Sequence, residues 1–60
     1  MTDVTITLKN NEKQSLSTDV EENELLKILN TSRFIKFNYY DGEQWKSTFV
    51  NTNEIVSIDF

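Results

Sequence analysis

Residues 34–50 read FIKFNYYDGEQWKSTFV, and this stretch determines how the chain is expected to fold. Its aromatic residues are large and prefer strands, and the Asp41-Gly42 pair is a strong hairpin turn signal. The chain's one Trp, two Tyr and four Phe all lie at or beyond residue 34, and Gly42 is its only glycine. The C-terminal half is therefore predicted to be antiparallel sheet that supplies most of the bulk for a core.

The length of the turn at residues 41–42 decides which side chains face each other. A two-residue turn would put Phe37 opposite Lys46. A three-residue loop would align Phe37 or Tyr39 with Trp45. The three-residue form is expected, because it keeps the apolar face continuous.

A second hairpin is predicted at residues 51–54. A four-residue loop there turns the strand over residues 44–50 into a strand over residues 55–60 and pairs Val50 with Ile55. This register is favoured because it gathers the large apolar groups on one face of the sheet.

The N-terminal half begins with alternating apolar and polar side chains over residues 4–8, as in a strand with one buried face. A polar turn at residues 10–13 leads to a short strand over residues 14–17. Leu16 is expected to lie opposite Leu8 in this first hairpin.

The pattern then changes to a helical period. Thr18 and Asp19 are candidate N-caps, each with a glutamate three residues later as a capping box requires. The apolar residues that follow share one helix face: Leu25, Leu26, Ile28 and Leu29. This pattern predicts a helix from about residue 20 to residue 30.

Together these elements predict one α+β domain, residues 1–60, with an antiparallel sheet of four to five strands and one helix packed on one face (ββαβββ order). Leu25, Ile28 and Leu29 are expected to cover the core. The aromatic residues assigned to that core are Phe37, Tyr39, Trp45, Phe49 and Phe60. A domain this small has a thin core and no cysteine for disulfides, so self-association is the expected source of added stability.

The opposite face of the sheet provides candidate binding residues. Strand alternation directs four large apolar side chains away from the helix: Phe34, Tyr40, Val50 and Ile55. An apolar patch of this kind on a small domain is typical of an association surface, and the terminal strand offers an open edge. We predict a non-catalytic protein-binding or regulatory module that binds itself, as a homodimer, and an unknown protein through this face or edge.

The composition argues against catalysis and against cofactors. Without His or Cys the chain has no nucleophilic triad and no zinc-type ligands, and one glycine cannot form a phosphate-binding loop. No enzyme activity, cofactor or metal site is expected. The chain also has no apolar run that would form a signal peptide or a membrane span, and the cysteine-free composition suits the cytoplasm.

Acidic residues around the predicted helix start allow an alternative function. They are Asp19, Glu21, Glu22 and Glu24. In the simpler interpretation they stabilise the positive end of the helix dipole. In the alternative they imitate a phosphate backbone and block a nucleic-acid enzyme. In size and charge the chain resembles the small phage inhibitors of uracil-DNA glycosylase.

A third hypothesis is single-stranded nucleic-acid binding. Sheet aromatics could stack on bases beside Arg33, Lys36 and Lys46. The net charge of −4 makes nucleic acid an unfavourable partner.

Parts of the C-terminal half also resemble known proteins. Residues 34–37, 41–43 and 50–58 are similar in style to short orphan proteins of Gram-positive bacteria and their phages. The phrase NTNEIVSI, residues 51–58, is also similar to the strand–turn–strand of small swarming and flagellar regulator proteins. In those regulators the hairpin precedes the helix, whereas here it follows, so the resemblance implies no functional residues.

Overall fold

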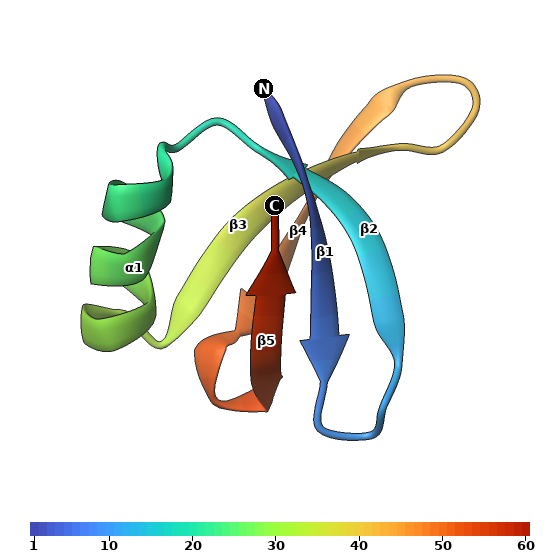
Figure 1. The fold of residues 1–60 in the computed structure, drawn as a ribbon. Coiled ribbons are helices and arrows are strands. Elements are labelled where there is room, and N and C mark those ends of the chain that lie inside the picture. The colour runs from blue at the N-terminus through green and yellow to red at the C-terminus, as the bar shows by residue number, and fades with distance from the viewer.

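The computed structural model describes residues 1–60 as a five-stranded antiparallel sheet with one α-helix and one short 3-10 helix (Figure 1). The elements are β1 (Thr2–Leu8), β2 (Lys13–Thr18), α1 (Glu22–Thr31), β3 (Phe34–Tyr40), β4 (Trp45–Asn51), η1 (Thr52–Glu54) and β5 (Ile55–Asp59). The predicted α+β class and ββαβββ order are confirmed. Neither helix has the length and apolar character needed to cross a membrane.

The strands lie in the order β4-β3-β2-β1-β5, so the predicted pairing of residues 55–60 with residues 44–50 is wrong. β5 instead pairs with β1, with Leu8 opposite Ile55 and Ile6 opposite Ile58. The physical reason is η1, which carries the chain away from β4. Thr52 anchors this turn, because its N–H and its hydroxyl both donate to the Arg33 carbonyl, at 2.8 and 3.1 Å.

The β1–β2 hairpin forms as predicted, but its register differs. Leu16 lies opposite Val4 rather than Leu8. The Leu8 N–H donates to the Glu12 carbonyl at 2.8 Å, and Asn11 adopts a left-handed conformation with φ 68°. This turn ends the β1–β2 ladder at Thr7, while the pairing of β1 with β5 on its other edge continues to Leu8.

The β3–β4 hairpin has a four-residue connection, residues 41–44, so both the expected three-residue loop and the two-residue turn are wrong. Tyr40 pairs with Trp45, and Phe37 pairs with Thr48. The Asp41 carboxylate holds the loop, because its Oδ1 atom accepts the N–H groups of Glu43 (2.9 Å) and Gln44 (2.8 Å). Gly42 supplies the required positive φ of 100°.

This loop is expected to make the stability of the hairpin depend on pH. The backbone N–H groups of Gln44 and Glu43, followed by Lys46, lower the pKa of Asp41 below its ordinary value of 3.8. A lowered pKa in the folded state adds stability above the unfolded-state pKa, and this stability is lost as the pH falls through the folded-state value. Asp41→Asn should therefore lower the urea midpoint at neutral pH, and the difference from wild type should shrink below about pH 4.

The control for this experiment is Glu43→Gln, which removes one charge from the same loop but no hydrogen-bonded carboxylate. Its urea midpoint should stay near that of wild type throughout the titration. An Asp41→Asn difference that is the same at every pH would show that the ionised carboxylate does not stabilise the loop.

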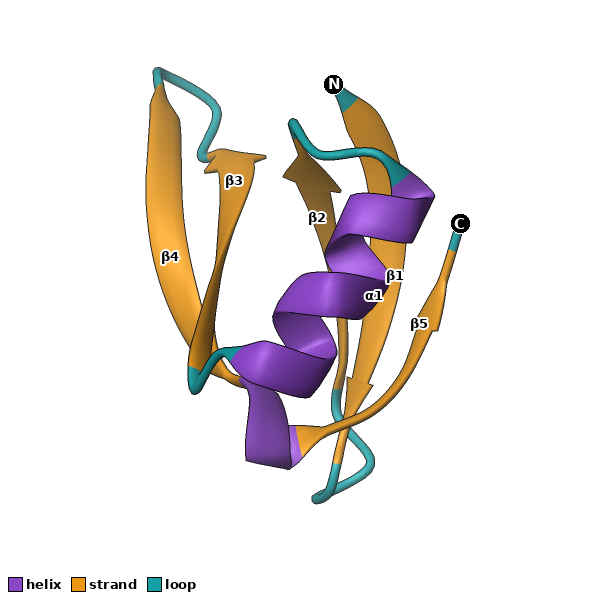
Figure 2. Ribbon diagram, turned by 90° about the vertical axis from the view of Figure 1, so that its left-hand side faces the viewer, coloured by secondary structure: helices purple, strands orange, loops and turns teal.

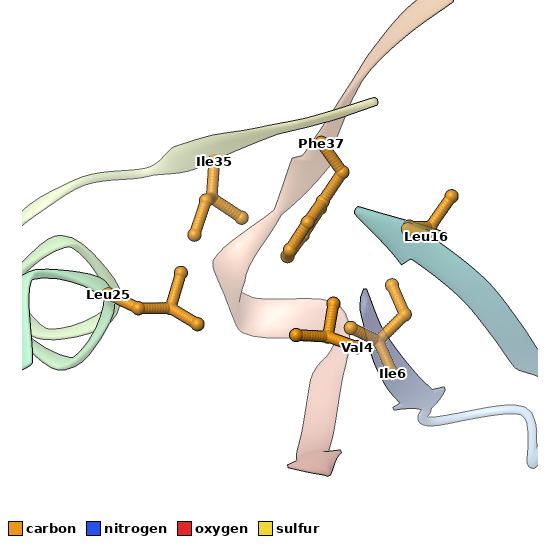
Figure 3. Close-up of a cluster of buried hydrophobic side chains, with 6 residues drawn as sticks. All are labelled: Val4, Ile6, Leu16, Leu25, Ile35 and Phe37. Carbon is orange, nitrogen blue, oxygen red and sulfur yellow. The ribbon is translucent and has the colours of Figure 1, made fainter. Parts of the chain in front are cut away.

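Six buried side chains from both hairpins and from the helix form the core (Figure 3). They are Val4, Ile6, Leu16, Leu25, Ile35 and Phe37. Phe37 is fully buried, and Tyr39 packs against the cluster, as expected. The core assignment of Trp45, Phe49 and Phe60 is wrong, since all three are more than half exposed. Because the loop has four residues, Trp45 and Phe49 lie on the face of their outward-pointing partners, Tyr40 and Lys36.

The helix begins at Glu22, and its N-cap residue is Glu21, which makes no side-chain capping bond. The expected caps are therefore wrong: the Thr18 hydroxyl accepts the Val20 N–H at 3.3 Å, and Asp19 accepts from Asn38 at 3.2 Å. Figure 2 shows α1 lying in front of the sheet. From α1, Leu25 belongs to the buried cluster, and Ile28 and Leu29 pack against it.

Candidate functional site

The outward-facing side of the β3–β4 hairpin carries the largest aromatic cluster exposed to solvent. Ile35 and Phe37 point into the core, so their neighbours along β3 point outward. The aromatic residues on this side are Phe34, Tyr40, Trp45 and Phe49, with 52%, 55%, 54% and 68% of their surfaces exposed. We call these four residues the outer aromatic surface.

The outer aromatic surface has two ends. At one end the rings of Tyr40 and Trp45 meet edge to face, with their centroids 5.6 Å apart. At the other end Phe49 lies opposite Lys36, which places it diagonally beside Phe34. Between the two ends, the Ser47 hydroxyl donates to Asn38 Oδ1 at 3.1 Å. Large rings therefore flank a short polar centre.

The sequence-predicted interface residues separate into two pairs. Phe34 and Tyr40 are exposed on the outward face, as the alternation indicated. Val50 and Ile55 do not point away from the helix as expected: both are half-buried and pack against the core. The reason is pairing, because Val50 lies opposite Ile35 and Ile55 lies opposite Leu8.

Sequence reasoning missed Trp45 and Phe49 as surface residues. One signal could have found them. Asp41 at the start of the loop is a residue type that accepts backbone N–H groups two and three positions later, and this favours a four-residue connection. Counting four residues from Asp41 places Trp45 opposite Tyr40.

The rest of the outward face has a different character. β1, β2 and β5 contribute small polar and acidic side chains here, including Asp3, Ser17 and Asp59. The Ser17 hydroxyl donates to Asp3 Oδ1 at 3.0 Å. Asp3 and Asp59 line the same open hollow, of about 590 Å³, as Tyr40 and Trp45. Carboxylates beside the aromatic rings disfavour a phosphate backbone on this face.

The acidic residues of the alternative hypothesis lie around the start of α1: Asp19, Glu21, Glu22 and Glu24. All four are exposed. Glu22 and Glu24 occupy the first turn, where the helix dipole favours them. Asp19 accepts a hydrogen bond from Asn38 of β3. No group of three or more acidic side chains gathers closely enough to hold a metal ion.

A second apolar surface lies between the helix and the terminal strand, and we call it the α1–β5 groove. It has a volume of about 410 Å³, and seven of the ten residues that line it are hydrophobic. Leu25, Leu26 and Leu29 line it from α1. Ile55, Val56 and Ile58 line it from β5, and Phe60 lines it just after that strand. Glu22 is the only charged residue in the lining.

No known protein family, curated protein or solved structure matches this chain. The features that bear on function are therefore the exposed surfaces of the protein. Two of them expose large apolar side chains: the outer aromatic surface and the α1–β5 groove. Exposed apolar clusters of this kind suit contact with another macromolecule.

Proposed function

We propose that this protein is a small, non-catalytic protein-binding module that forms a homodimer through its outer aromatic surface. In this proposal the second copy packs on the four rings, and at the Phe34–Phe49 end it also meets α1, because both rings line a hollow together with Ile28. The observation that carries the proposal is the exposure of Phe34, Tyr40, Trp45 and Phe49 on two adjacent strands. The cysteine-free chain suits a cytoplasmic module, because it needs no oxidising compartment.

The size of the aromatic surface supports this function. An aromatic side chain offers about 200 Å², so four that are a little over half exposed present roughly 450 Å² per copy. A standard interface buries about 800 Å² per partner. The four rings would therefore form the central part of an interface that the surrounding polar residues complete. Trp and Tyr are also the residue types that most often dominate binding energy.

The edge of β4 adds a second favourable feature. β4 is hydrogen-bonded to β3 alone, so its other edge has unpaired backbone groups. Trp45 and Phe49 both project from this strand. A second copy could thus contact the rings and also pair with the strand edge.

Single-stranded nucleic acid is less well supported as a partner of the same surface. Lys36 lies opposite Phe49 at one aromatic end, but Lys46 forms an ion pair with Asp41 at 3.1 Å. Asp3 and Asp59 face the same hollow as the rings, and the chain carries a net charge of −4. Phosphate groups would be repelled, whereas the ring of a second copy would not.

Sedimentation equilibrium of wild type and Trp45→Ser tests the homodimer. Removing a central aromatic from an interface commonly costs about 2 kcal/mol or more, and a homodimer loses it from both copies, so the dissociation constant should rise by at least about 30-fold. The matched control is Val56→Ser, which removes an apolar side chain that is also more than half exposed but lies outside the outer aromatic surface. A protein that is monomeric at millimolar concentration, or a dimer that neither Trp45→Ser nor Phe49→Ser weakens, would contradict the proposal.

A further inference from the structure

The α1–β5 groove shares no residue with the outer aromatic surface, but Phe60 at its end also lines the hollow beside Tyr40 and Trp45. The groove follows the edge of a strand. Residues 55–58 line it in succession, together with Phe60. Successive residues of a strand point to opposite faces. Because the lining includes residues that point to both faces, the groove runs along the edge of β5 rather than across one face of the sheet.

The edge of β5 is free to accept another strand. β5 pairs with β1 only, and it lies at the end of the sheet opposite β4. Unpaired N–H and C=O groups on such an edge form a template for an extended chain. Binding modules that add a peptide strand to an edge gain affinity from backbone hydrogen bonds and specificity from pockets for alternate side chains.

Both walls of the groove carry large apolar side chains that are exposed to solvent. Leu26 of α1 has 56% of its surface exposed, and Val56 of β5 has 65% exposed. Leu25 and Leu29 continue the apolar wall from the helix. An extended segment that pairs with the edge of β5 would cover these exposed side chains with every second side chain of its own.

The charges around the groove favour a basic occupant. Glu22 is its only charged lining residue, and the single ion pair in the protein, between Lys46 and Asp41, leaves Glu22 without a basic partner. The first turn of α1 carries Glu22 and Glu24, and its last turn carries no basic residue. A second copy docked by two-fold symmetry would bring its own Glu22 and no basic lining residue to the groove, so a basic segment of a different protein is the better match.

We propose that the α1–β5 groove binds an extended segment of a different protein. The segment adds to β5 as a further strand, places apolar side chains at alternate positions against Leu26 and Val56, and sets a Lys or Arg beside Glu22. This partner site lies outside the surface proposed for the homodimer, so the dimer and the peptide complex can be tested apart.

The probe for this site is a displayed library of random peptides about a dozen residues long, selected against the folded wild-type protein. Enriched peptides are expected to alternate apolar and polar residues and to include Lys or Arg. Leu26→Ser and Val56→Ser should each weaken the best peptide by about tenfold or more. Phe49→Ser, which alters the end of the outer aromatic surface that shares no hollow with the groove residues, is the matched control and should leave peptide affinity unchanged.

A charge exchange tests the role of Glu22. Glu22→Lys should weaken the selected basic peptide, and the same peptide with its Lys or Arg changed to Glu should recover binding to that variant. Addition of the peptide to ¹⁵N-labelled protein should shift the amide signals of residues 55–59 more than those of β4.

Three results would overturn the proposal. One is the failure of the library to yield any binding peptide. Another is a set of peptides whose affinity neither Leu26→Ser nor Val56→Ser changes, or whose consensus is acidic. The third is a homodimer that Val56→Ser disrupts and Trp45→Ser preserves, because the groove would then hold a second copy. This last result would also refute the proposed dimer surface, whereas the first two would leave that surface untouched.

Discussion

Phe37→Ala is expected to remove most of the stability of this protein. Phe37 is fully buried at the centre of the cluster that joins both hairpins. Truncating a buried Phe costs about 3–5 kcal/mol, because the removed atoms lose their burial and leave a cavity. A 60-residue domain has only about 3–9 kcal/mol of stability in total. Urea unfolding followed by far-ultraviolet circular dichroism should therefore show a variant that is unfolded, or nearly so, in dilute buffer.

Phe49→Ala provides the matched control on the neighbouring strand. It makes the same chemical change at a side chain that is 68% exposed. Its unfolding free energy should fall by no more than about 0.5 kcal/mol at low protein concentration, where self-association contributes little. If both variants lost similar amounts of stability, Phe49 would belong to the core and the register of the β3–β4 hairpin would be wrong.

Leu25→Ala is expected to cause the second-largest loss, about 2–5 kcal/mol. Leu25 is 1% exposed and is the only fully buried side chain of α1. Helices of ten residues are not stable by themselves in water, so α1 depends on this contact with the sheet. Circular dichroism should show a lower urea midpoint, and hydrogen exchange should show α1 amides losing protection before those of β1.

Leu26→Ala is the control for the helix experiment. The two leucines are adjacent, but Leu26 has 56% of its surface exposed. Its unfolding free energy should change by about 0.5 kcal/mol or less. A Leu26→Ala variant that was destabilised as strongly as Leu25→Ala would mean that α1 presents a different side to the sheet.

The local patterns of the chain were sufficient to predict most of the elements. Alternation over residues 4–8 and 34–40 identified two strands, and it correctly directed Phe37 inward and Phe34 outward. The apolar stripe of the helix correctly pointed to Leu25 as a core residue. These predictions succeed because the side chains of one element follow the geometry of that element alone.

The errors arise where one element has to be placed against another. Adding one residue to the loop after Tyr40 reverses which side chains of β4 face the core, and the four-residue form depends on bonds made by the Asp41 carboxylate. That single difference moved Trp45 and Phe49 from the predicted core to the surface and moved Val50 the other way. The candidate site was therefore half predictable: Phe34 and Tyr40 lie before the loop, whereas its other members come after it.

The pairing of β5 with β1 could not be seen in any local pattern. Residues 55–58 would suit either β4 or β1 as a neighbour, since both offer apolar side chains. The choice depends on η1, which Thr52 ties to the carbonyl groups of Ser32 and Arg33, directly after the C-terminal end of α1. Such a contact joins residues about twenty positions apart.

The pairing of β5 with β1 affects how the sheet forms while the protein is being synthesised. Residues 5–8 can pair with β5 only after residues 55–59 have left the ribosome. Until then β1, the strand that supplies Val4 and Ile6 to the core, has one edge unpaired. Contacts so distant in sequence slow folding and keep a strand edge open to other chains. Synthesis of β5 is thus the step that completes the five-stranded sheet and closes the open edge of β1 to unwanted pairing.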